Sequence, residues 1–522
     1  MLFNSFEFIF FFFPVVFVGF FCIARLSHRL AALWLAAASL FFYGWWNPNF
    51  VLLLLASVAF NYAMAWAIAK RQGSPEGKLL LATAVTVNLA VLAFFKYTNF
   101  FISTANTVAG TELGLTRIIL PLGISFFTFT QIAFLVDVYR GIAHEFDFVR
   151  YLLFVTYFPH LIAGPVLHHR QMMPQFAQAG IYRIHLPDVA VGIAIFTIGL
   201  AKKVLLADTF AEYANPVFEG ASDGAYPRFF VAWTGALAYT LQLYFDFSGY
   251  SDMAIGLSRM FGVILPLNFN APYKATNIIE FWRRWHMTLS RFLRDYLYFP
   301  LGGNRLGKAR RYINLMATML LGGLWHGANW TFVAWGGLHG LFLVINHLWQ
   351  EVRVRLGIAQ RQSTRTSRAF SIGLTFLCVV LAWVFFRADT FGSAIRILKG
   401  MVGWNGFNLP ENLAPFAGTG HRGPFLRFDG TFGDNALLEE LGLPTFVAFL
   451  VLGLTIIWAC PTTQRLFRMD TPAGERDATA PSPLYDVARS RFSTGGALLI
   501  SLLFAISLVS LSRTSPFLYF QF

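Results

Sequence analysis

A histidine stands among glycines and tryptophans inside an apolar part of the sequence. His326 lies in the segment Gly322–Trp330, which reads GGLWHGANW. An ionisable side chain is costly to keep in a membrane and is therefore a candidate for function. Because imidazole takes up a proton near neutral pH, it is suited to activating a hydroxyl nucleophile. A second interpretation stays open, in which His326 is hydrogen-bonded between helices and the glycines allow tight packing.

The depth of His326 favours a role in chemistry. The residue follows Tyr312 by fourteen positions, which corresponds to about 21 Å of helix. A helix that starts at the inner interface would carry it well inside the ~30 Å hydrocarbon core. Asn329 is predicted to share a helix face with His326, where it would orient the ring or hold a substrate carbonyl.

A second group of chemically active side chains lies in Phe281–Ser290, which reads FWRRWHMTLS. At helical spacing one face carries Trp282, Trp285, His286 and Leu289. Tryptophan beside arginine is typical of a helix at the membrane surface, and the spacing alone favours that interpretation. The alternative is a cytoplasmic entrance where Arg283 and Arg284 bind the phosphates of a donor such as coenzyme A.

Other polar motifs give weaker indications. His168 and His169 are adjacent, so they do not share a helix face, and we expect no metal site. The sequence has no HExxH, GxSxG or P-loop motif, which argues against a soluble-type hydrolase or nucleotide enzyme.

The elements that must position these residues are membrane helices. The chain has 522 residues, of which 56% are hydrophobic and 13% charged. Apolar runs recur at Leu30–Trp46, Phe50–Ala69, Leu79–Phe95, Phe370–Phe386, Phe446–Cys460 and Gly496–Leu511. Each is near the roughly 20 residues that a helix needs to cross a bilayer. The sequence therefore predicts an all-α polytopic membrane protein, with a single domain over residues 1–522.

The positive charge predicts the orientation of this protein in the membrane. The formal net charge of +14 comes from residues in the loops between apolar runs, so we expect a membrane topology signal and no nucleic-acid partner. Residues 251–311 form a basic segment that is expected at the cytoplasmic face, and residues 387–443 form an outer loop. The pattern predicts about eleven crossings with both termini outside. Tyr151–Leu167 contains Pro159, Gly164 and Pro165 and is expected to be a broken or re-entrant element.

Together these segments resemble the membrane-bound O-acyltransferase superfamily, in particular its AlgI-like branch of alginate O-acetyltransferase membrane subunits. The resemblance covers nearly the whole chain. The segments that carry it are Pro121–Phe129, Phe158–Pro165, Gln242–Asp252, Phe281–Ser290, Gly322–Trp330 and Tyr519–Phe522.

The resemblance implies a ring of membrane helices around a central tunnel in a bacterial inner membrane. It implies that His326 is the catalytic histidine and that His286 is a second important polar residue. We therefore expect O-acyl transfer, with acetyl-CoA as the donor substrate, no bound cofactor, and an exported, alginate-like polysaccharide as acceptor. A periplasmic SGNH-type acetylase is the expected partner.

Each candidate residue has an expected role in this reaction. His326 would act as general base, and Asn329 would polarise the thioester carbonyl or hold the imidazole tautomer. His286 would shape the donor entrance with Arg283 and Arg284, and Trp285 and Trp325 are expected to contact substrate. Two alternatives remain: an acyltransferase for teichoic acid or lipid, and a transporter, which internal repeats would favour but the sequence does not show.

Overall fold

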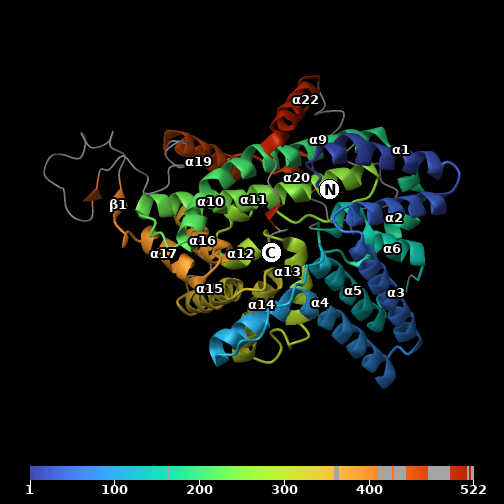
Figure 1. The fold of residues 1–522 in the computed structure, drawn as a ribbon, viewed down its shortest axis with the longest axis horizontal. Coiled ribbons are helices and arrows are strands. Elements are labelled where there is room, and N and C mark those ends of the chain that lie inside the picture. Colours follow the sequence, from blue (N-terminus) through green and yellow to red (C-terminus); the bar gives the residue numbers. More distant parts are fainter. Residues whose placement is uncertain are drawn as a thin grey trace. The chain divides into compact units, whose positions relative to one another are not determined.

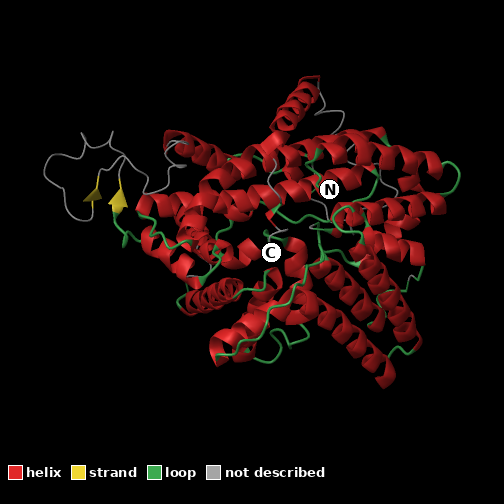
Figure 2. Ribbon diagram, in the orientation of Figure 1, coloured by secondary structure: helices red, strands yellow, loops and turns green. Residues whose placement is uncertain are grey.

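Helices make up most of the structure, a computed structural model of the chain (Figures 1 and 2). It describes residues 1–144, 146–162, 164–357, 364–408, 426–427, 443–467, 469, 494–513 and 517–518. The strands in this part are two-residue segments, β1 (Phe407–Asn408) and β2 (Leu426–Arg427), which pair in parallel. The terminal motif Tyr519–Phe522 and most of the outer loop 387–443 lie outside the described residues.

Six of the described helical segments are long and apolar enough to cross a membrane. They are Glu7–Ala24, Asn49–Lys70, Pro75–Ala109, Leu186–Ser222, Trp330–Arg355 and Arg365–Arg387. Three apolar helices are shorter, namely Ile124–Tyr139, Thr445–Trp458 and Thr494–Val509. The prediction of a polytopic α-helical membrane protein is confirmed, while the number of about eleven crossings stays a prediction.

The chain was expected to form one domain, and its contacts divide it into two compact units that alternate along the sequence. Unit 1 contains residues 1–204, 248–268 and 463–521, and unit 2 contains residues 205–247 and 269–462 together with the last residue. Two elements continue from one unit into the other, the π-helix η3 (Lys202–Ala207) and the long helix α11 (Phe229–Met260).

Unit 1 begins with the π-helix η1 (Glu7–Phe12) and ends, within the described part, at the 3-10 turn η7 (Ser510–Arg513). Its α-helices are α1 (Phe13–Ala24), α2 (His28–Gly44), α3 (Asn49–Lys70), α4 (Pro75–Ala109), α5 (Ile124–Tyr139), α6 (Phe148–Thr156), α7 (Phe158–Leu161), α8 (His169–Ala177), α9 (Leu186–Ala201), α20 (Thr463–Leu466) and α22 (Thr494–Val509), with the 3-10 turn η2 (Ala179–Tyr182) before α9. The expected break in Tyr151–Leu167 is present, because α6 ends before Tyr157 and α7 is a single turn.

Polar side chains inside unit 1 pair with one another. Asn61 of α3 and Asn88 of α4 exchange two amide hydrogen bonds, of 3.0 and 2.7 Å. Lys202 donates to Asp252 at 2.6 Å and to Thr463 at 3.0 Å, and Thr463 also donates to Asp252 at 2.7 Å. Since unpaired polar groups are costly among apolar helices, these contacts hold distant segments of the chain in register.

Unit 2 carries the segments with the candidate histidines. Its α-helices are α10 (Asp208–Ser222), α12 (Ile278–Trp282), α13 (Met287–Leu293), α14 (Lys308–His326), α15 (Trp330–Arg355), α16 (Arg365–Arg387), α17 (Phe391–Met401) and α19 (Leu443–Trp458). A 3-10 turn, η4 (Pro272–Lys274), precedes α12, and a π-helix, η5 (Arg294–Tyr298), follows α13.

Helices α14 and α15 form a hairpin (Figure 1), and their backbones approach closely at facing glycines. A Cβ atom at Gly336 would collide with the carbonyl oxygen of Met319, and one at Gly323 would collide with the carbonyl oxygen of Phe332. Small residues at facing positions allow this approach. The hairpin therefore fixes the end of α14, where His326 lies, against the start of α15.

We expect the substitution Gly336→Ala to destabilise the protein by about 1–3 kcal/mol, because the added methyl group forces the two helices apart. The matched control is Gly337→Ala, whose Cβ would lie 3.4 Å from Leu320, an ordinary van der Waals distance. Thermal unfolding of the purified, detergent-solubilised full chain measures both. Equal unfolding temperatures for the two variants would contradict the packing argument.

Candidate functional site

All the residues that the sequence singles out for chemistry lie in unit 2. They are His286, His326, Asn329, Trp285, Trp325, Arg283 and Arg284. Both histidines are buried, with 0% of His286 and 6% of His326 exposed. Trp285 and Trp325 are buried as well, whereas Arg283 is exposed. The candidate site is therefore a buried group of rings with an arginine at its outer edge.

His326 is the last residue of α14, and aromatic rings surround it. The helix stops there because Gly327 takes an extended conformation, with φ −157° and ψ 150°. The His326 ring lies edge-on to Trp335 at 5.1 Å and to Phe386 at 5.1 Å, measured between ring centroids. Trp325 lies 4.9 Å away. An imidazole at a helix end among such rings is shielded from bulk water, as a catalytic base in a membrane protein would be.

Asn329 does not share a helix face with His326, so that part of the sequence prediction is wrong. The chain leaves helical geometry at Gly327, and Asn329 instead caps α15, where its Oδ1 accepts from the Thr331 backbone N–H at 3.1 Å. Its amide nitrogen donates to the carbonyl oxygen of Asp389 at 2.7 Å. Both halves of the side chain are thus engaged in structure, and a direct role toward substrate stays a prediction.

His286 is held in an unusual backbone conformation. The expected continuous helix over Phe281–Ser290 is broken, since α12 ends at Trp282 and α13 begins at Met287. His286 lies between them with φ 40° and ψ 55°, in the left-handed region. Among the described residues the other non-glycine residue with positive φ is Ala271. Such strain persists where the surrounding structure enforces it and is common at functional sites.

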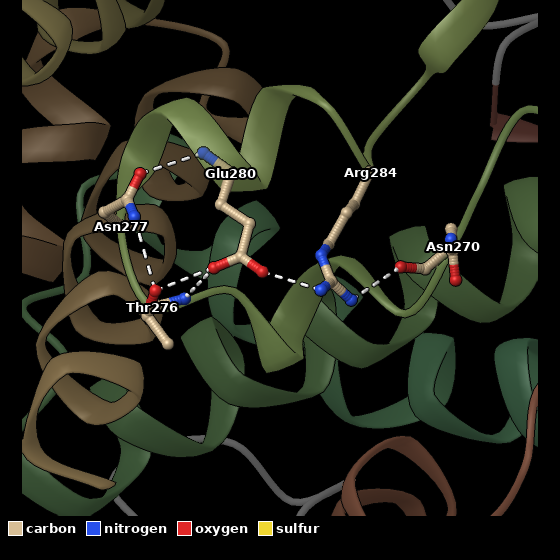
Figure 3. Close-up of polar contacts among 5 residues, drawn as sticks. All are labelled: Asn270, Thr276, Asn277, Glu280 and Arg284. Atoms are coloured by element: carbon tan, nitrogen blue, oxygen red, sulfur yellow. Dashed lines mark hydrogen bonds and ion pairs between the residues drawn. The ribbon is translucent and has the colours of Figure 1, made fainter. Parts of the chain in front are cut away.

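A network of hydrogen bonds connects residues close to His286 in the sequence (Figure 3). The Glu280 carboxylate accepts from the Thr276 N–H at 2.8 Å and from the Thr276 hydroxyl at 2.7 Å. Arg284 donates to the other carboxylate oxygen at 2.6 Å and to the carbonyl of Asn270 at 3.4 Å. The Asn270 N–H in turn donates to the Arg284 carbonyl at 2.9 Å. We call these four residues the clasp, because they close residues 270–284 next to His286.

The clasp is charged at neutral pH. Burial alone would raise the pKa of Glu280, but hydrogen bonds from Thr276 and the charge of Arg284 outweigh it, so the pKa is lowered from its ordinary value. Burial also lowers the pKa of His286, to about 3, which leaves its imidazole neutral. Because Arg284 already has a carboxylate partner, Arg283 is the more accessible of the two arginines for an anionic donor.

A histidine that the sequence analysis missed extends the group of rings. His339 of α15 is fully buried and lies 4.9 Å from Trp335, which also contacts His326. The sequence did contain a signal for it, because His339 lies between glycines in an apolar run, at Gly337 and Gly340, as His326 does. In the part of the chain that the structure describes, no group of three or more His, Cys, Asp or Glu residues could hold a metal ion.

We expect Glu280→Gln to destabilise the protein by about 1 kcal/mol at pH 7, a modest value because the ion pair is partly exposed. A carboxylate whose pKa is lowered by folding stabilises the protein above its unfolded pKa, and this contribution is lost as the pH falls through the folded pKa. The difference in unfolding temperature between wild type and Glu280→Gln should therefore shrink in acid. Thermal unfolding from pH 7 to pH 3 measures it.

The control for this series is Glu76→Gln, because Glu76 pairs with Arg71 at an exposed position. Its effect is expected to stay within about 0.5 kcal/mol. A difference for Glu280→Gln that grows in acid would contradict the assignment of the clasp.

Comparison with known proteins identifies the family of this chain. The model of the membrane-bound O-acyltransferase family, MBOAT, matches residues 40–393, which include both His286 and His326. A peptidoglycan O-acetyltransferase of Helicobacter pylori is 43% identical over 439 residues, which cover 78% of this chain and 81% of the relative. A probable alginate O-acetylase of Azotobacter vinelandii is 39% identical over the whole of both chains.

A more distant relative transfers a different group. A teichoic acid D-alanyltransferase of Streptococcus thermophilus is 28% identical over 280 residues, which cover 51% of this chain and 68% of the relative. The family match spans more than half of the chain, and the two closer relatives are covered over most or all of their length. The chain is an O-acyltransferase and belongs to the membrane-bound O-acyltransferase family.

Proposed function

We propose that this enzyme moves acetyl groups from cytoplasmic acetyl-CoA across the membrane for O-acetylation of an exported polysaccharide. The observation that carries the proposal is the buried His326 at the end of α14, in the same unit as the strained His286. The names of the relatives support an acetyl group and a carbohydrate-containing acceptor, since they are O-acetylases of alginate and of peptidoglycan.

In the proposed reaction His326 is the general base. It takes the proton of the attacking hydroxyl while the oxygen forms a bond to the acetyl carbonyl carbon. The carbon–sulfur bond of the thioester then breaks, and the proton passes to the departing thiolate. Burial among Trp325, Trp335 and Phe386 keeps water away, which protects the thioester from hydrolysis.

The donor would enter from the basic segment 251–311, which we place at the cytoplasmic face. Arg283 is exposed and suits a phosphate of coenzyme A, while Arg284 holds the clasp beside His286. Trp285, buried next to His286, would line the path of the acyl group.

The acceptor side would face the periplasm of a bacterial inner membrane, with both chain termini outside. A periplasmic SGNH-type acetylase would take the acetyl group onward to the polymer. The loop 387–443 is the proposed docking surface, and its described residues are 387–408, which include α17, together with 426–427 and 443.

A second candidate is transfer of an acyl group to teichoic acid, which the D-alanyltransferase relative favours. That relative has a lower identity and covers only part of the chain, so it supports this candidate less than the O-acetylases support the first. The transporter alternative that the sequence left open loses its support, because the family to which the chain belongs consists of acyltransferases.

We expect His326→Ala to lower acyl transfer by about 10²–10⁴-fold, the usual contribution of a general base. The measurement is coenzyme A release from acetyl-CoA by the purified full chain, with a carbohydrate acceptor and the periplasmic partner supplied. O-acetylation of the cell's polysaccharide, at matched protein level, gives the second reading.

The control is His347→Ala, which removes a less buried histidine from the same helix hairpin and should leave turnover within about twofold of wild type. Wild-type turnover in His326→Ala would overturn the general-base role. If wild type released coenzyme A from no acyl-CoA but accepted an activated alanine, the teichoic-acid reading would replace the proposal.

A further inference from the structure

Several aromatic rings lie around His339. It is 0% exposed, and its ring lies 4.9 Å from Trp335, 5.2 Å from Trp282 and 6.0 Å from Phe281, measured between centroids. Trp383 lies at 6.1 Å. These rings come from α12, α15 and α16, all within unit 2.

The polar atoms of this group have no hydrogen-bond partner within the described part of the chain. This holds for both ring nitrogens of His339 and for the indole N–H groups of Trp282 and Trp335. Buried polar groups are nearly always hydrogen-bonded, so several orphaned atoms in neighbouring rings require an explanation. Histidine in such a place is also a poor choice for packing alone, since phenylalanine fills similar space without the desolvation cost.

These atoms can donate hydrogen bonds, so they suit a ligand atom that accepts them. An imidazole carries at least one N–H in either protonation state, and each indole carries one more. The group therefore offers three N–H donors without a permanent charge, and Trp335 connects it to the catalytic His326 at 5.1 Å. Asn329, which the sequence suggested as the donor to a carbonyl, has its amide engaged at the start of α15.

We propose that His339, together with the indole N–H groups of Trp282 and Trp335, binds the carbonyl oxygen of the acyl group and stabilises the negative charge that develops on it. The inference rests on the proposed acyl transfer. When the acceptor oxygen bonds to the carbonyl carbon, the electron pair of the C=O bond moves to its oxygen, where these N–H donors stabilise it. The pair returns as the carbon–sulfur bond breaks, and the acceptor's proton leaves through His326. Donors fixed in advance in a water-poor site act strongly on such a charge.

The test compares His339→Phe with His339→Gln in the purified full chain. His339→Phe keeps an aromatic ring but removes every donor, and should lower kcat for coenzyme A release by about 10²–10³-fold. The KM for acetyl-CoA should stay within about threefold, because the lost interaction strengthens only in the transition state. His339→Gln supplies an N–H donor, and its kcat should be about tenfold higher than that of His339→Phe. Trp335→Phe should lower kcat by about tenfold.

Unfolding temperature separates this role from packing. His339→Phe should unfold at the wild-type temperature or above it, because the substitution removes buried polar atoms without partners. A packing role predicts the opposite order of activity, with phenylalanine tolerated and glutamine harmful. His347→Phe, on the same helix, is the matched control and should retain wild-type kcat.

Each outcome bears on one proposal only. If wild type releases no coenzyme A with acceptor and partner present, the proposed function fails. If wild type turns over and His339→Phe matches it, or if His339→Phe raises KM alone, the binding of the carbonyl oxygen is overturned. Should His339→Phe fail to fold, His339→Gln and Trp335→Phe test the proposal instead. Trp335→Phe keeps an aromatic ring but removes the indole N–H, so the proposal requires it to have a lower kcat than wild type.

Discussion

Polar groups among apolar helices have no water to pair with, so each needs a partner in the protein or on a substrate. In unit 1 the amides of Asn61 and Asn88 pair with each other, and Lys202 is surrounded by acceptors. In unit 2 the same requirement is met at Glu280, which has two donors on one oxygen and one on the other. Around Trp335 the protein supplies hydrogen-bonding atoms without supplying their partners. The proposed binding of the acyl carbonyl oxygen would give the N–H groups of Trp282, Trp335 and His339 a partner.

The two candidate histidines are held in position in different ways. His286 adopts a backbone conformation that costs free energy, and the partly exposed clasp lies in the same segment. The backbone of His326 is not strained in this way. Gly327 ends its helix, and close packing of α14 against the glycines of α15 fixes the position of that helix end. One histidine is thus positioned by hydrogen bonds and the other by close packing of helices. A change in ionic strength will therefore affect the position of His286 more than the position of His326.

Much of the architecture was predictable because it follows from local patterns. Apolar runs identified the candidate spans Asn49–Lys70, Pro75–Ala109 and Arg365–Arg387, and the cost of an ionisable residue among apolar ones singled out His326 as a candidate. The positions of the helix breaks at His286 and Gly327 were not predicted. Near them lie contacts that periodicity does not show, between Asn270 and Arg284 and between Asn329 and the start of α15. His339 carried the same local signal as His326 but was overlooked, and its importance emerges only once Trp282 and Trp335 are seen beside it.

The alternation of the two units along the sequence has a consequence for how the chain is made. Unit 2 is drawn almost entirely from residues 205–462, so a ribosome delivers nearly all of it before Thr463 emerges. Lys202 and Asp252 of unit 1 are synthesised far earlier, yet one of their hydrogen-bond partners is Thr463. During translation Lys202 and Asp252 therefore lack one of their hydrogen-bond partners until Thr463 is made. The unit that carries the histidines can already assemble at that stage. The order of synthesis favours completing the chemical centre first and closing the remainder of the protein last.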